Sequence, residues 1–404
     1  MPDLPRGPGK VEQEAVRIPL TQPSLTHRER EALARVFESG RISSNSVEIS
    51  AFEAEFARWH GSLHGVAVSS GTAALHLAFL SLDAMGPICP ATWVGMPALT
   101  FAACAAMAVK SGGIPRFLDV NPFSANVDSV RAKAFFQEKA SKVYLAVHLY
   151  GIPASIPDIL DGTPLIEDCA EAIGATIEDR PVGRIGHVAT FSLYGNKILT
   201  TGEGGMLVTS DGDLAERARR LRDHGLVPGA RPYTHDRIGY NYRMTALQAA
   251  VGRAQLARLP QMLLERRLVE DAYRDGLEPV GEAGLTARFL CPENERAVTS
   301  PWLVSIVLPS QRIRDDLATH LSAGGIETRP FFVPLPDLEP YRGYVDAKER
   351  WPGARGLSGC GLSLPTFVGL DLEDVDKITR RIRSFLRGSG RGPRRRLPPK
   401  ARRG

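Results

Sequence analysis

Short apolar runs that alternate with helix-like segments constrain the fold of this chain more than any other feature. Between about residue 40 and residue 226, the strand-like runs are residues 65–68, 115–118, 143–147, 165–167 and 206–209. A strand that is apolar along its whole length belongs to a sheet covered on both faces, and helices between such strands indicate parallel connections. The pattern therefore predicts an α/β fold with a large, mostly parallel sheet between helices.

The rest of the chain predicts a second, smaller α/β unit. Residues 245–267 have the apolar spacing of one long helix. Residues 301–308 are then the clearest strand of the smaller unit, and its last helix begins near Asp371. We expect a flexible N-terminal arm at residues 1–17, a large domain at 18–265, a small C-terminal domain at 266–386 and a disordered basic tail at 387–404.

Positive charge is concentrated in that tail. The 404 residues have a formal net charge of +5, and residues 387–404 carry seven Arg and one Lys without an acid, which leaves −3 for the remainder. Such a segment is either a solvated appendage or a segment that attracts nucleic acid or another anionic surface. Because charge runs of this kind are usually only solvated, we expect an appendage and no nucleic-acid partner.

Cysteine usage and hydropathy bear on the compartment. The five cysteines are scattered and include no C-x-x-C pair, a pattern that disfavours disulfides and zinc sites and favours a reducing cytoplasm. The uncharged stretch 88–109 contains Pro90 and Pro97 and is rich in alanine. We interpret it as a loop leading into a buried helix, since prolines interrupt a membrane span. We predict neither a metal site nor membrane association.

Small and polar residues follow the first strand, where open α/β sheets bind ligands. Gly71, Thr72 and Ala73 begin a predicted helix. Its free N–H groups and partial positive charge suit a phosphate, Gly71 permits close approach, and Thr72 adds a hydroxyl. The alternative for this stretch alone is an ordinary capped helix.

Two charged residues follow later strands. Asp168 comes directly after residues 165–167, where a buried carboxylate requires a cationic partner. Lys197 follows a strand that ends near Ser192 and precedes a glycine-rich turn. A lysine in a partly apolar site has a lowered pKa and forms a Schiff base with an aldehyde. Taken singly, Asp168 is explained as a salt bridge or cap, and a lone lysine such as Lys197 is usually a surface lysine.

These features together describe one ligand, pyridoxal 5′-phosphate (PLP). The helix start would bind its phosphate, with Ser192 as a further donor, and Lys197 would hold its aldehyde. Asp168 would keep the pyridinium nitrogen protonated. Phe101 is a candidate for stacking on the ring.

Ordered motifs run from about residue 18 to residue 385. They include SSGTAALHLAF, MPALTFAA, IEDCAEAIGA, TFSLYGNKILTTGEGGM, GYNYRMTALQAAVGRAQL and GIETRPFF. In these motifs and in their order, the chain resembles the DegT/StrS sugar aminotransferases. The resemblance implies the fold-type I architecture of PLP-dependent transferases, with a mostly parallel seven-stranded sheet in the large domain and a smaller C-terminal α/β domain.

The resemblance also implies roles for single residues. Lys197 matches the lysine that bonds to the cofactor and shuttles a proton, and Asp168 matches the partner of the pyridine nitrogen. Glu171 occupies the position of a residue near the phenolic oxygen of PLP. A lysine at position 197 indicates the aminotransferase branch, because the dehydratase branch has histidine there.

Further matches concern the phosphate and the subunit structure. Thr72, Ala73 and Ser192 fall at phosphate-contacting positions. Asn241 matches an asparagine that reaches the phosphate of the neighbouring subunit. The resemblance therefore implies a homodimer with shared active sites.

Within the family, the chain is most similar to GDP-perosamine synthases. Those enzymes transfer an amino group from L-glutamate to C4 of a GDP-4-keto-6-deoxyhexose. His148, Tyr242, Arg243 and Arg329 are candidates for substrate contacts, and packing or salt bridges are the alternative for each.

One departure leaves the substrate open, because Pro336 stands where the family commonly has histidine. The alternatives are an aminotransferase for another cyclic ketone, such as an inosose, a nucleoside-antibiotic intermediate or a 3-keto sugar nucleotide, and a non-catalytic binding protein that retains the fold.

Overall fold

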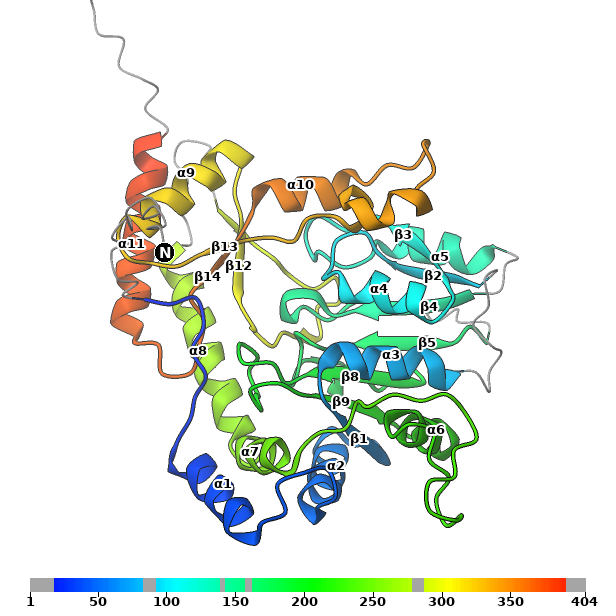
Figure 1. Ribbon diagram of the computed structural model, residues 1–404. Coiled ribbons are helices and arrows are strands. Elements are labelled where there is room, and N and C mark those ends of the chain that lie inside the picture. Colours follow the sequence, from blue (N-terminus) through cyan, green and yellow to red (C-terminus); the bar gives the residue numbers. More distant parts are fainter. Residues whose placement is uncertain (1–17, 83–91, 139–141, 157–161, 278–286, 390–404) are drawn as a thin grey trace, which may run out of the picture.

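A seven-stranded sheet organises the larger part of this computed structural model, which describes residues 18–82, 92–138, 142–156, 162–277 and 287–389 (Figure 1). Its strand order is β1-β9-β8-β5-β4-β2-β3. β9 is antiparallel to both of its neighbours, and the other pairs are parallel. The strands are β1 (His64–Val68), β2 (Trp93–Pro97), β3 (Ile114–Leu118), β4 (Lys142–Val147), β5 (Leu165–Asp168), β8 (Val188–Ser192) and β9 (Gly205–Thr209).

Both faces of this sheet are buried, as the apolar strands predict. Val66 and Val68 of β1 pack into one core cluster, and Ala67 between them packs into another. Helices α3 (Gly71–Ser81), α4 (Ala103–Lys110) and α6 (Gly212–Arg222) supply the first cluster. Helices α2 (Val47–His60) and α7 (Ala246–Leu256) supply the second, and α5 (Ser129–Gln137) packs against Tyr144 and Ala146 of β4. The predicted α/β class with a mostly parallel large sheet is confirmed.

A second core lies around a four-stranded antiparallel sheet of order β10-β12-β14-β13. Its strands are β10 (Arg288–Phe289), β12 (Val304–Val307), β13 (Arg329–Pro330) and β14 (Gly361–Leu364), and the packed helices are α8 (Leu259–Leu277), α9 (Gln311–Ser322) and α11 (Leu372–Ser389). The remaining elements are α1 (His27–Ser39), α10 (Pro352–Cys360), the 3₁₀ turns η2 (Leu149–Gly151), η3 (Leu335–Asp337) and η4 (Glu339–Tyr344), and a small sheet of β6 (Thr176–Ile177), β7 (Arg180–Pro181) and β11 (Ala297–Val298).

Helix α8 connects the two cores. Figure 1 shows it running from beside α7 toward β12 and β14. Leu259 and Met262 in its first half pack with the large sheet, whereas Val269 and Tyr273 in its second half pack with the small one. The proposed domain boundary between residues 265 and 266 therefore falls inside a continuous helix.

The structure corrects three predictions of local structure. Residues 245–267 are not one helix: α7 ends at Leu256 and α8 begins at Leu259, because Pro260 lacks the N–H that a continuous helix needs. Residues 93–97, expected in a loop, form strand β2. The predicted tail begins too early, since α11 continues to Ser389.

The two terminal segments of the chain are largely outside the described residues, whereas the predicted cap of the last helix is observed. The proposed N-terminal arm and residues 390–404 of the proposed tail lie outside the described residues. Asp371 accepts a hydrogen bond from Glu373 N at 2.9 Å at the start of α11, as a helix cap does. In the described part of the chain, no helix is long and apolar enough to cross a membrane.

Candidate active site

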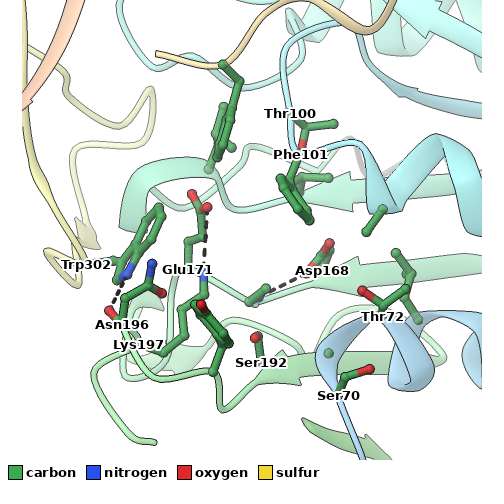
Figure 2. A pocket seen from close by; sticks show the side chains of 18 of the residues that line it. Ser70, Thr72, Thr100, Phe101, Asp168, Glu171, Ser192, Asn196, Lys197 and Trp302 are labelled. Atoms are coloured by element: carbon green, nitrogen blue, oxygen red, sulfur yellow. Dashed lines mark hydrogen bonds and ion pairs between the residues drawn. The ribbon is translucent and has the colours of Figure 1, made fainter. Parts of the chain in front are cut away.

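The carboxyl ends of β4, β5 and β8 open into a cavity of about 290 Å³ (Figure 2). Trp302, Arg329 and Phe332, from the part of the chain that follows α8, line it together with the start of α3. Open α/β sheets bind their ligands at this position. The predicted residues that line the cavity are Gly71, Thr72, Phe101, Asp168, Glu171, Ser192, Lys197 and Arg329.

Lys197 lies in the loop between β8 and β9, where its backbone N–H donates to Tyr194 O at 2.9 Å. Its Nζ is 3.6 Å from Glu171 Oε1 and 3.7 Å from the centroid of the Trp302 ring. Burial lowers the pKa of Lys197, and the carboxylates of Glu171 and Asp168 partly oppose this shift. A lowered pKa increases the fraction of neutral amine, which is the nucleophilic form.

Asp168 ends β5 and is buried. Ala170 N donates to its Oδ1 at 3.0 Å, and the thiol of Cys104 on α4 donates to its Oδ2 at 3.4 Å. Within the described ranges, no basic side chain lies within salt-bridge distance of this carboxylate. Burial raises the pKa of Asp168. A buried carboxylate without an ion pair favours a cationic ligand, because such a ligand offsets the cost of desolvation.

Glu171 follows β5 and is held by the backbone of Tyr150, whose N–H donates to Glu171 Oε2 at 2.9 Å. Tyr150 has a φ of 54°, a conformation that non-glycine residues rarely adopt. Its hydroxyl accepts a hydrogen bond from Phe332 N at 3.1 Å, which links η2 to the segment that follows β13. Burial raises the pKa of Glu171, although Lys197 opposes the shift.

The start of α3 forms the end of the cavity near Ser192. Ser70 caps the helix by accepting a hydrogen bond from Ala73 N at 3.1 Å. As the first two helical residues, Gly71 and Thr72 have N–H groups without a carbonyl partner in the helix. A Cβ on Gly71 would lie 2.7 Å from Ser192 Cβ, so glycine is required for this close approach of helix and strand.

Two further predicted residues, Phe101 and Arg329, also line the cavity. Phe101 is 57% exposed, and its ring centroid is 5.9 Å from that of Phe332. Arg329 lines the cavity, and no carboxylate in the described segments lies within salt-bridge distance of its guanidinium.

The structure does not bring His148 to the cavity. His148 is completely buried, with Nε2 bonded to Glu167 Oε2 at 3.0 Å and Nδ1 accepting from Ala154 N at 3.0 Å. Both ring nitrogens are therefore engaged within the protein. Its backbone N–H donates to Asp168 O at 3.0 Å, so its position supports β5 rather than a substrate contact.

Asn241, Tyr242 and Arg243 lie apart from the cavity as well. Arg243 forms an ion pair with Asp223 and lines a separate hollow of about 450 Å³. Tyr242 hydrogen-bonds to His76 Nδ1 at 3.1 Å, and Asn241 is exposed. None of the three lines the cavity around Lys197 in this subunit. Ala73 is also absent from its lining, and its N–H is used by the helix cap.

Sequence reasoning missed several residues of the site. Trp302 precedes an apolar strand and looks like a core residue; no local pattern indicates that its ring faces a lysine more than 100 positions earlier. Cys104 lies in an alanine-rich helix, and Phe332 follows a short edge strand. Tyr150 belongs to the stretch VHLYG. Its backbone N–H reaches Glu171 from a backbone with an unusual φ, which the residue type does not predict.

The residues present fit PLP. The buried Asp168 has no ionic partner among the described residues and matches a pyridinium nitrogen, and Lys197 offers an amine of lowered pKa at the cavity wall. Gly71 and Thr72, whose N–H groups begin α3, line the cavity and suit a phosphate. Figure 2 shows Lys197, Asp168 and Thr72 around the same cavity, where one ligand can reach all three.

Comparisons with known proteins agree with this site. Residues 23–383 match the model of the DegT/DnrJ/EryC1/StrS aminotransferase family. A GDP-perosamine synthase from Vibrio cholerae is 38% identical over 91% of this chain and 99% of its own length. A GDP-perosamine synthase from Caulobacter vibrioides is 37% identical over 90% of this chain and 96% of its own.

A solved structure shows the same fold. The Streptomyces venezuelae protein DesV, determined in complex with a ketimine intermediate, superposes with a TM-score of 0.80. The two chains are 32% identical, and the match covers 89% of this chain and 94% of DesV. The chain therefore belongs to the DegT/DnrJ/EryC1/StrS aminotransferase family and is a PLP-dependent transaminase.

Proposed function

We propose that the protein transfers an amino group from L-glutamate to C4 of a GDP-4-keto-6-deoxyhexose. The observation that carries the catalytic part is the Lys197 amine, on a side chain only 12% exposed, facing a cavity that also contains Asp168, which has no ion pair with a described residue. The choice of ketone is supported by two GDP-perosamine synthases that share 37–38% identity over nearly their whole length. Pro336, the residue that departs from the family pattern, is buried in η3 and does not line the cavity.

PLP supplies an aldehyde that bonds to amines. Its ring withdraws electrons from the substrate carbon that carries the amino nitrogen. Asp168 would hold the proton on the ring nitrogen, and its Cys104 and Ala170 donors keep its carboxylate oriented. The Lys197 amine, when free, would remove and return a proton at the reacting carbon. Glu171, 3.6 Å from that amine, would hold it toward the cavity.

Arg329 is our candidate for the carboxylate of the amino donor. Its guanidinium lines the cavity and has no carboxylate of the described chain within salt-bridge distance, so a bound anion would complete its environment. Phe101 and Phe332 would limit the entry of water and provide flat surfaces for the ring and the sugar.

We further propose that the enzyme is a cytoplasmic homodimer. Asn241 is exposed and lies away from its own cavity, a position compatible with a contact to the phosphate of a second subunit. The cysteines Cys104, Cys169, Cys291 and Cys360 are unpaired, as expected in a reducing compartment.

A substrate panel tests the proposal. The purified protein, loaded with pyridoxamine phosphate, is mixed with GDP-, UDP- and dTDP-linked 4-keto sugars, a 3-keto sugar nucleotide and an inosose, and product is measured by mass spectrometry. We expect the GDP-4-keto-6-deoxyhexose to have the highest kcat/KM, by at least about tenfold. A higher value for another ketone would refute the substrate and leave the transaminase assignment intact.

Lys197→Ala tests the catalytic assignment. The variant is expected to lose amino transfer from glutamate while its thermal unfolding midpoint stays close to that of the wild type without PLP. Full turnover by this variant would refute the role of Lys197.

A further inference from the structure

The indole ring of Trp302 forms a wall beside the amine of Lys197. Lys197 Nζ lies 3.7 Å from the ring centroid and 3.6 Å from Glu171 Oε1. Figure 2 shows Trp302 and Glu171 on adjacent sides of this lysine. A cation over an indole face is attracted by the negative potential of the ring, and the carboxylate adds a second attraction. The free ammonium therefore has one preferred position.

Trp302 is itself held from two sides. Its Nε1–H donates to the carbonyl of Asn196, the residue before Lys197, at 2.8 Å. Arg266 on α8 donates from Nη1 to the carbonyls of Pro301 and Trp302 at 3.1 and 2.7 Å. The ring thus contacts both the backbone and the amine of the lysine segment, and its own backbone is fixed by a guanidinium.

Arg266 is unusual because nothing neutralises its charge. It is 2% exposed, and no carboxylate in the described chain lies within salt-bridge distance. Its Nε has no hydrogen-bond partner among the described residues. Burial lowers its pKa to about 9. A buried cation without a counter-ion is costly, so its hydrogen bonds to the two carbonyls are the structural gain that offsets this cost.

We propose that Trp302, held by Arg266, is a positioning residue that keeps the Lys197 amine directed at the cavity whenever this lysine is not bonded to the cofactor. Transamination releases the lysine during every cycle and must recover it afterwards. Without the ring, the four-carbon side chain of Lys197 would sample several rotamers, and water would enter beside it. The inference rests on the transaminase chemistry of the family and is independent of which ketone is used.

The test measures how fast Lys197 captures PLP. PLP is mixed with the cofactor-free protein, borohydride reduces the bond between the lysine and PLP at timed intervals, and the modified Lys197 peptide is quantified by mass spectrometry. We expect Trp302→Leu to slow capture about 3- to 30-fold, because the Lys197 side chain would then be spread over several rotamers that do not face the cavity. Trp302→Phe, which keeps a ring face, is expected to stay within about threefold of wild type.

Two controls separate positioning from general damage. Trp59→Leu removes a half-buried tryptophan of α2 that does not line the cavity and should leave the capture rate unchanged. Arg266→Lys keeps a positive charge, but its nitrogen lies one bond nearer the backbone than Nη1, which donates to both carbonyls, so it should slow capture with the ring still present. Trp302→Leu should then slow capture by a smaller factor in the Arg266→Lys background than in the wild type.

A second readout does not involve PLP capture. In protein loaded with pyridoxamine phosphate, Lys197 is free, and its rate of reductive methylation is compared with that of Lys142, whose amine donates to backbone carbonyls of α5. Trp302→Leu should speed methylation of Lys197 and leave Lys142 unchanged. Wild-type capture and methylation rates in a folded Trp302→Leu protein would overturn the proposal; a variant that binds PLP but captures it slowly would support it.

Discussion

Replacing Gly71 by alanine tests the contact between α3 and β8 at the proposed phosphate site. The new Cβ would lie 2.7 Å from Cβ, 3.0 Å from Cα and 3.1 Å from Oγ of Ser192. Carbon atoms pack at about 3.5–4.0 Å, so the helix start and the strand end would have to separate by about 1 Å. A rotamer change moves only Oγ of Ser192. Its Cα and Cβ stay in place, so rotation of the side chain cannot relieve the clash.

The expected cost follows from overpacking, which destabilises proteins by about 1–3 kcal/mol. Because 1.4 kcal/mol corresponds to a factor of ten, PLP binding should weaken about 5- to 150-fold if the strain is relieved by moving the helix start. The affinity is measured by titrating cofactor-free protein with PLP and following absorbance.

Matched variants make this result specific. Gly356→Ala in α10 places a Cβ with no atom within 4 Å, and should leave PLP binding unchanged. Ser192→Gly in the Gly71→Ala background removes the clashing Cβ, so Gly71→Ala should cost less affinity there than in the wild type. PLP affinity within twofold of wild type for Gly71→Ala would refute the argument.

Three further predictions concern Asp168, Cys104 and the C-terminus. Asp168→Asn should slow amino transfer by about 100-fold or more. Burial raises the pKa of Asp168, so the native state loses stability as pH rises through that pKa; without PLP, the Asn variant should therefore exceed wild type in urea stability at pH 7, and the difference should vanish near about pH 4. Equal stability at both pH values would contradict this reasoning. Cys104→Ala removes the thiol donor to Asp168 and should weaken PLP binding about 2- to 10-fold, whereas Cys104→Ser should retain it; equal affinities would show that the thiol contributes nothing. Truncation after Ser389 should leave activity and thermal stability unchanged, and a large loss of activity would assign a function to the tail.

The sequence predicts those parts of the site that depend on strand ends. Asp168 ends β5 and Lys197 follows β8, and topology alone brings such positions to one edge of a sheet. The helix start at Gly71 is predictable for the same reason. These residues suffice to predict the cofactor, because each is placed by its own neighbouring strand.

Other parts depend on contacts between distant segments. Trp302 reaches Lys197 only after α8 has placed the small sheet beside the large one, and nothing near Trp302 in the sequence indicates this. His148 has a residue type that suggests chemistry, but its two buried hydrogen bonds give it a structural role. The strand β2 contains Gly95 and ends at Pro97, and both residues disfavour a strand when propensity alone is considered.

The helix α8 has a consequence for any attempt to divide this enzyme into fragments. A cut between residues 265 and 266 would leave each half with a short, frayed end and an apolar stripe that had lost its covering. Split-protein reporters and permuted chains made at that point should therefore aggregate rather than reassemble. Exposed turns such as the one around Gly229 offer safer places for new termini, because no helix has to be severed there.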